Sequence, residues 1–135
     1  MAQAKQDIVN KYFEYYSKKD MEGIATVMDK NVTWYFLGQH PLAGIKKGIT
    51  EVIGFFDKVG KIMKESNPEI HKLIVSENDK YLIECIHSRT NRTDNNNLEH
   101  YACVLWTFEN EKIIEGRHFF SDQEAMNKYF TALAT

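Results

Sequence analysis

Histidine and glutamate side chains inside apolar segments are the residues of this chain best suited to chemistry. Glu84 stands within the apolar run 81–86, and His100 and His118 stand in two later runs. A histidine accepts or donates a proton near neutral pH, since its ordinary pKa is about 6.5. A buried carboxylate needs a polar partner. Glu84 is therefore expected either to face solvent or to pair with His100 or His118 as an acid–base dyad.

Aromatic residues near these groups are suited to line an apolar cavity with few polar anchors. Trp34 and Tyr35 lie in one apolar run, and Trp106 lies in another. His40 precedes a proline in a loop, where it serves either the loop itself or a ligand. With His100, these residues are the expected contacts of a small apolar molecule.

The register of one hairpin decides which of these side chains meet. Successive residues of a strand point to opposite faces, so His100 and Trp106 share a face. A two-residue turn at 110–111 places Cys103 opposite His118. One extra residue there, a bulge, places Val104 opposite His118 and brings all three side chains onto one face. Both registers remain open at this point.

Motifs of metal and nucleotide chemistry are missing from the sequence. The 5 histidines are scattered, and the 2 cysteines lie in separate apolar segments. Cys85 and Cys103 are expected to be buried reduced thiols, although a disulfide is possible if their strands pair. There is no phosphate-binding glycine loop and no nucleophile elbow. Any catalysis is therefore expected to need no metal or cofactor.

Charge and hydropathy restrict the expected partners and location. The formal net charge is -2, and no basic stretch exceeds a lysine pair, which argues against a nucleic-acid partner. The apolar runs are too short to span a membrane. Residues 1–7 lack the apolar core of a signal peptide, so a cytoplasmic location is expected. The 135 residues fit one domain, 1–135.

Periodicity predicts the elements that must position these residues. An opening amphipathic helix ends near 18–19, and a short helix capped by Asp20 follows. A final helix is capped by Asp122, and the polar run 93–97 reads as a hairpin tip. Between them the pattern predicts a strand at 32–37, a loop at 38–44, a helix at 49–63 and strands at 71–76, 81–89, 99–108 and 113–121.

The order of these elements indicates a fold class. Helices dominate the first half of the chain, and four strands follow in the second half. This arrangement is typical of an α+β fold with an antiparallel sheet. The helices are available to cover one face of that sheet.

Three ordered blocks resemble the SnoaL-like and ketosteroid isomerase-like branch of the nuclear transport factor 2-like superfamily. The first block is a helix pair with Asp20 and Gly23. The second is the segment 38–56, which contains the sequence Pro-Leu-Ala-Gly and a Phe-Phe pair, and the third is the closing segment 111–122. The resemblance implies a cone-shaped α+β barrel, in which a curved antiparallel sheet wraps around the N-terminal helices and encloses a pocket.

The resemblance also assigns positions in that pocket. The aspartate base of ketosteroid isomerases falls at Tyr35, and the second acid of their oxyanion hole falls near Val104. Tyr12 matches their tyrosine on the first helix. In epoxide hydrolases of the superfamily an aspartate stands where this chain has His118. His118 is therefore expected to point into the pocket. The catalytic acids of ketosteroid isomerases and of epoxide hydrolases are both incomplete in this chain.

The sequence supports hypotheses from different functional classes. The first is a small-molecule protein acting by cofactor-independent acid–base chemistry, as an isomerase, cyclase or hydrolase, with His118, Glu84 and Tyr12 as catalytic residues. The alternatives are a non-catalytic ligand-binding module and a protein-interaction module of the same fold. The resemblance further implies a homodimer formed through the outer face of the sheet.

Overall fold

Helices and strands follow one another in the predicted order. The computed structural model describes residues 4–134, so the ends of the predicted 1–135 domain lie outside the described part. The elements are α1 (Lys5–Ser17), α2 (Met21–Val27), β1 (Met28–Phe36), β2 (Gly44–Lys47), α3 (Ile49–Ser66), β3 (Glu69–Glu77), β4 (Tyr81–Arg89), β5 (Glu99–Glu109), β6 (Lys112–Phe120) and α4 (Gln123–Leu133). Within 4–134, no helix has the length and apolar character needed to cross a membrane.

Two aspartates begin helices as the sequence predicts. The Asp20 carboxylate accepts a hydrogen bond of 2.9 Å from the backbone N–H of Gly23 at the start of α2. Asp122 accepts one of 3.0 Å from Ala125 at the start of α4. Each carboxylate satisfies a backbone donor that has no partner within the helix.

Several element ends shift by one to three residues from the sequence-based expectation, and β1 and β2 differ more. β1 begins at Met28 rather than 32, because the polar residues 29–31 hide its first half. The segment after the predicted loop forms a short strand, β2, in which Gly44 pairs with Phe36. Only four residues long, β2 offers too little alternation for periodicity to detect.

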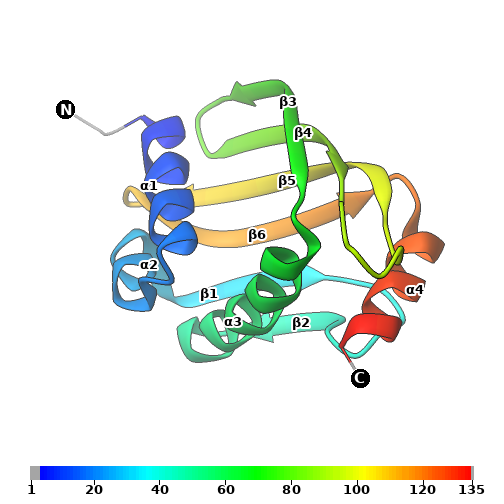
Figure 1. Cartoon of the computed structure of the whole chain (residues 1–135). Coiled ribbons are helices and arrows are strands. Elements are labelled where there is room, and N and C mark those ends of the chain that lie inside the picture. The colour runs from blue at the N-terminus through cyan, green and yellow to red at the C-terminus, as the bar shows by residue number, and fades with distance from the viewer. Residues whose placement is uncertain (1–3, 135) are drawn as a thin grey trace.

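The six strands form one curved sheet in the order β2-β1-β6-β5-β4-β3. All neighbouring pairs are antiparallel except β1 and β6, which run parallel. This pair corrects the expectation of a wholly antiparallel sheet. No hairpin joins β1 to β6, because the chain leaves through α3 and returns to β1 only at its last strand. The sheet stays open, with edges at β2 and β3 (Figure 1).

The helices α1, α2 and α3 cover one face of the sheet, here called the inner face, and α4 lies at one end (Figure 1). The core lies between these helices and the inner face, and Ile8, Val9, Ile24, Val52 and Phe56 are among its buried members. Burial of these apolar side chains is the main force that holds helices to sheet. The opposite side of the sheet is called the outer face.

The two cysteines meet on the outer face. Cys85 and Cys103 are paired directly across β4 and β5. Both are free, and the Cys103 thiol donates a hydrogen bond of 2.8 Å to the Cys85 sulfur. The thiols are half-buried, in contrast to the predicted full burial, because the outer face of these strands carries no helix.

Candidate functional site

A cavity of about 410 Å³ opens between the inner face of the sheet and helices α1, α3 and α4. Most of its wall is apolar or aromatic. Its polar groups, apart from two indoles, are few: Asn10, Tyr12, Lys72, Glu84, Ser88, His100 and His118. This volume and this lining are typical of sites for small molecules.

Strand pairing arranges the sheet side of the cavity in rows. Trp106, Gly116 and Trp34 form one row across β5, β6 and β1. In the adjacent row, Glu84 of β4 lies opposite Val104, which lies opposite His118. Further along β4 and β5, Ser88 pairs with His100.

A bulge in β6 decides which side chains these rows contain. Thr107 pairs with Glu115 but Phe108 pairs with Ile113, so Ile114 has no partner in the register. The turn at 110–111 itself has two residues, both with positive φ, as in a type I′ hairpin. Because of the bulge, the second of the two predicted registers holds. His100, Trp106 and His118 share the inner face.

His118 lies among aromatic rings in the cavity wall. Its ring centroid is 5.1 Å from Phe36, 5.6 Å from Trp34 and 5.7 Å from Phe120. Within residues 4–134, burial alone sets the environment of the imidazole, with no hydrogen bond or charge of another side chain acting on it. Burial lowers the pKa of His118 to about 4, so the imidazole is neutral at physiological pH. A neutral imidazole facing a cavity can act as a base.

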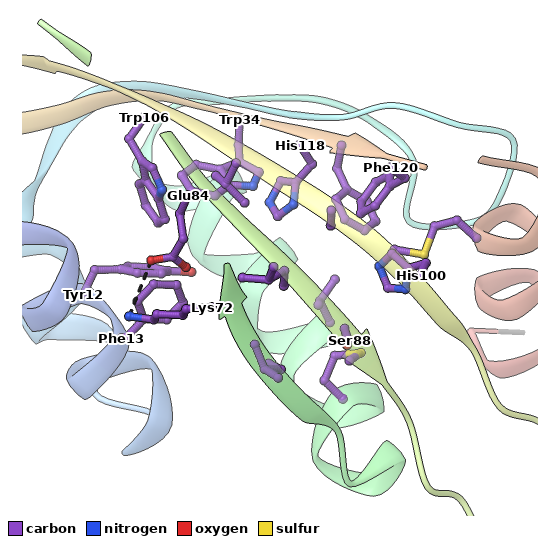
Figure 2. Close-up of a pocket in the computed structure, with 18 of the residues that line it drawn as sticks. Tyr12, Phe13, Trp34, Lys72, Glu84, Ser88, His100, Trp106, His118 and Phe120 are labelled. Atoms are coloured by element: carbon purple, nitrogen blue, oxygen red, sulfur yellow. Dashed lines mark ion pairs between the residues drawn. The ribbon is translucent and has the colours of Figure 1, made fainter. Parts of the chain in front are cut away.

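Glu84 points into the cavity, which is the inward of its two predicted orientations. Only 5% of its surface is exposed. Its Oε2 lies 3.5 Å from the Nζ of Lys72 on β3, and Figure 2 shows this ion pair beside Tyr12 and Phe13. The predicted dyad with His100 or His118 is therefore corrected. The adjacent strand supplies a lysine as the partner that a buried carboxylate requires.

Tyr12 and the two tryptophans form the most aromatic part of the wall. The Tyr12 ring lies 5.1 Å from Trp106 and 6.3 Å from Trp34, and the two indoles are 5.3 Å apart. Gly116 makes this packing possible, because a Cβ there would collide with the Trp34 ring. Burial, with a smaller effect of Tyr16, raises the pKa of Tyr12 well above its usual range. The Tyr12 hydroxyl therefore stays protonated and can donate.

His100 lies farther along the wall, next to Phe120 at 5.8 Å. It is almost fully buried, and its Nδ1 has no hydrogen-bond partner. Burial lowers its pKa and the charge of His87 lowers it further, while Asp122 acts in the opposite direction. His100 is therefore a second neutral imidazole of the cavity wall.

The family model of the SnoaL-like domain matches residues 9–116. The chain belongs to the SnoaL-like domain family. The matched range includes Tyr12, Trp34, Glu84 and Trp106 of the SnoaL-like cavity and ends before His118. Among curated proteins, no match to the chain was found.

Solved structures share the SnoaL-like fold over almost the whole chain. Bal32a from a soil-derived mobile gene cassette is 22% identical, with 93% of this chain and 95% of that chain covered, at a TM-score of 0.79. TerC, co-crystallised with polyporic acid, is 15% identical with 87% and 91% covered at a TM-score of 0.71. A candidate SnoaL-like polyketide cyclase from Jannaschia sp. CCS1 is 14% identical with 95% and 92% covered at 0.70. At these identities the likeness shows the fold alone.

Two of the predicted ligand contacts lie away from the SnoaL-like cavity. Tyr35 alternates with Trp34 and so points to the outer face, where the Arg117 guanidinium lies 3.8 Å from its ring centroid. His40 serves its loop, since its Nδ1 accepts a hydrogen bond of 3.2 Å from the Leu42 N–H. Neither residue lines the cavity, which corrects their expected positions.

Sequence reasoning missed three residues that shape the SnoaL-like site. Lys72 and Ser88 are polar groups of the wall, and Phe13 of α1 faces Lys72 at 6.0 Å. Glu84 inside an apolar strand signals that a polar partner lies nearby, but the local pattern does not tell which residue of which strand supplies it. Phe13 belongs to the apolar stripe of its helix, which predicts packing against the sheet rather than a place in a cavity wall.

Among residues 4–134, no three His, Cys, Asp or Glu side chains lie close enough together to hold a metal ion.

Proposed function

We propose that this SnoaL-like protein binds a small, mostly apolar molecule in the cavity and moves a proton on it, with His118 as the base. The state of His118 is the observation that carries the proposal. Burial keeps the imidazole neutral, with a pKa of about 4, and the His118 side chain lines the cavity. Such an imidazole is in its unprotonated form across the physiological pH range, as a general base requires.

The row of Glu84, Val104 and His118 provides space for a flat ligand. The two outer members lie two strand spacings apart on one face, roughly 10 Å between backbones. In the proposed step the bond between a ligand carbon and its hydrogen breaks, and the proton moves to a nitrogen of His118. The electron pair moves into an adjacent carbonyl group. Return of the proton to another ligand atom completes an isomerisation without consuming a further reactant.

Tyr12 can stabilise the negative charge that forms on the ligand. Its hydroxyl stays protonated because burial raises its pKa, and its ring lies 5.1 Å from that of Trp106. Preorganised donors of this kind commonly contribute a large part of enzymatic rate acceleration.

Two similar structures support a small-molecule role. TerC was co-crystallised with polyporic acid, and the Jannaschia protein is a candidate polyketide cyclase. Both concern proteins below 25% identity, so they indicate what the fold accommodates elsewhere. The ligand and reaction proposed for this chain are inferred from its own cavity.

A non-catalytic binding module is the second candidate. The observation that favours it is the neutralisation of Glu84 by Lys72, which leaves a wall of mainly aromatic rings. In that case the cavity binds the same class of molecule but transfers no proton. The experiment below separates the two functions.

Proton exchange on a bound ketone tests the role of His118. We expect the protein to accelerate exchange of the α-hydrogens of 2-tetralone in D₂O, measured by NMR. His118→Gln should slow this exchange by roughly a hundredfold or more and leave binding intact, because it removes the base. The matched control is His87→Gln, since His87 lies on the outer face with Glu99 as its partner.

The outcomes assign the function. Equal exchange in wild type and His118→Gln would remove His118 from the mechanism. Binding of 2-tetralone without accelerated exchange would favour the non-catalytic module.

We further propose a homodimer formed through the outer face. Ile74, Tyr101 and Phe119 are at least half exposed on that face, with 61%, 58% and 50% of their surfaces accessible. Large apolar side chains exposed together commonly mark an interaction surface. A second copy of the chain is the proposed partner, and a different protein partner is the alternative.

A further inference from the structure

Polar atoms that lack hydrogen-bond partners gather at the cavity. Within residues 4–134, five buried side-chain nitrogen or oxygen atoms make no hydrogen bond: Trp34 Nε1, His40 Nε2, Glu84 Oε2, His100 Nδ1 and Trp106 Nε1. All but His40 belong to cavity-lining residues. Buried polar groups in folded proteins are nearly always paired. Glu84 Oε2 lies 3.5 Å from the Lys72 ammonium, so the two indole nitrogens and His100 Nδ1 are the cavity atoms that lack any partner. Their concentration at one cavity indicates that a bound molecule supplies the missing partners.

The two indoles form the best-defined part of this group. Trp34 and Trp106 lie on either side of Gly116 in one row, with ring centroids 5.3 Å apart. An indole N–H only donates, so each requires an acceptor. Their ring neighbours Tyr12 and Phe56 are aromatic faces and edges rather than carbonyl or carboxylate groups. An unpaired buried donor of this kind is costly to the fold.

We propose that the ligand carries a hydrogen-bond acceptor, a carbonyl or phenolate oxygen, which the indole N–H groups of Trp34 and Trp106 bind. This inference rests on the proposed small-molecule function and deepens it by naming the ligand chemistry. His118 packs against Trp34, with ring centroids 5.6 Å apart. Figure 2 shows the two side chains next to each other in the cavity wall. An oxygen held by the indoles therefore presents the adjoining part of the ligand to His118.

The position of the acceptor distinguishes this ligand from a hydrocarbon. The row next to the two indoles runs from His118 across Val104 to Glu84. Its Glu84 end holds the ion pair with Lys72. The ligand therefore has an apolar body over Val104 with its oxygen toward the tryptophans. Ordered water is the competing partner for the indoles, since it also accepts hydrogen bonds in polar cavities.

The presence of only 2 tryptophans makes the test direct. In ¹H–¹⁵N NMR spectra the chain gives two indole N–H signals. The probes are 2-tetralone and tetralin, which have the same ring system but only one of which carries a carbonyl. We expect 2-tetralone to shift both indole protons downfield and tetralin to leave their shifts nearly unchanged.

Variants test the same contact by affinity. Trp106→Phe, and separately Trp34→Phe, remove the N–H and keep an aromatic ring. Each should weaken 2-tetralone binding by about five- to tenfold, the loss typical of one hydrogen bond, and change tetralin binding less than about twofold. The control is Phe13→Leu, which alters the apolar wall without removing a donor and should affect both probes equally.

Each outcome bears on a specific claim. If 2-tetralone and tetralin move the indole signals alike, or if the ketone shifts other signals but neither indole, the acceptor subsite is wrong and the binding function stands. If neither probe moves any signal, both the subsite and the small-molecule function fail. If the indoles respond but His118→Gln leaves proton exchange unchanged, the subsite stands and the proposed catalysis fails. The spectra require no variant, so misfolding of a tryptophan variant leaves the test decisive.

Discussion

At His118, the burial that keeps the imidazole neutral also makes the stability of the fold depend on pH. The pKa is about 4 in the folded chain, against an ordinary value of 6.5. Between these values the unfolded chain binds a proton that the folded chain does not. The free energy of unfolding therefore falls as the pH decreases from 6.5 toward 4, by about 3 kcal/mol in total.

Comparison with His118→Gln isolates this contribution from those of the other histidines. We expect urea unfolding of the wild type to lose more stability between pH 6.5 and pH 4 than that of the variant. Above pH 6.5 the difference between the two proteins should stay constant. Parallel curves throughout this window would show that His118 is not buried in its neutral form.

The Glu84–Lys72 ion pair should contribute more to stability than a solvent-exposed ion pair whose charged atoms lie closer together. Glu84 is nearly buried, and Lys72→Met leaves its carboxylate without a cation, at an expected cost of roughly 1–3 kcal/mol. A double-mutant cycle with Glu84→Gln measures the coupling energy by urea unfolding.

The matched control is the exposed pair Glu14–Lys18, whose atoms lie only 3.1 Å apart. Water screens this pair, so its coupling should not exceed about 0.5 kcal/mol. A coupling at Glu84–Lys72 no larger than that of the control would contradict the assigned burial.

At the level of single residues, six of the side chains named from the sequence as site residues line the cavity, and their roles in binding or catalysis stay predictions. They are His118, His100, Trp34, Trp106, Glu84 and Tyr12. Tyr35 was misplaced because adjacent residues of a strand point to opposite faces, so Trp34 and Tyr35 cannot both line the cavity. Lys72 was missed because the partner of Glu84 depends on which strands are neighbours in space, which lies beyond local sequence patterns.

At the scale of elements, the packing of β6 against β1 depends on Gly116, a residue without a side chain. A Cβ at Gly116 would collide with the Trp34 ring, which Phe56 and Trp106 hold in place at 4.9 and 5.3 Å. Gly116→Ala should therefore lower the free energy of unfolding by about 1–3 kcal/mol or more. Thermal unfolding followed by circular dichroism measures the change.

Gly54 offers the opposite case within α3. A Cβ there meets no atom within 4 Å. Gly54→Ala should raise stability by about 0.5–1 kcal/mol, because alanine favours the helix and restricts the unfolded chain.

A Gly116→Ala protein as stable as wild type would show that Trp34 can move aside.

Local pattern determines most of the elements but not their pairing. β4 was predicted to its exact ends, and Asp20 and Asp122 begin their helices as expected. The bulge at Ile114 was one of two open registers, because a single unpaired residue leaves no mark in hydrophobic alternation. The parallel pairing of β1 with β6 was not foreseen, since it is set by the path of the whole chain.

For the whole molecule, the outer face is expected to determine the oligomeric state. Ile74, Cys85, Cys103 and Phe119 form one row across β3, β4, β5 and β6 on that face. Light scattering at micromolar concentration should give a dimer for the wild type. Phe119→Asp should give a monomer, because a charge replaces an apolar contact.

A charge reversal elsewhere controls for general electrostatic effects. Lys18→Glu follows α1, which covers the inner face, and should leave the dimer intact. A wild-type monomer at these concentrations would contradict the proposed interface. The cytoplasmic location and the exclusion of nucleic-acid partners stay predictions from composition.

The parallel pair of β1 and β6 has a consequence for the time course of folding. Trp34 and Gly116 meet across it, although most of the chain separates them in sequence. Contacts of such long separation slow folding, since a large loop must close before they form. On the ribosome, the β3–β5 meander can pair before β6 has been made, whereas the row that holds Trp34 cannot. We expect the emerging chain to acquire its binding wall only after synthesis of the last strand.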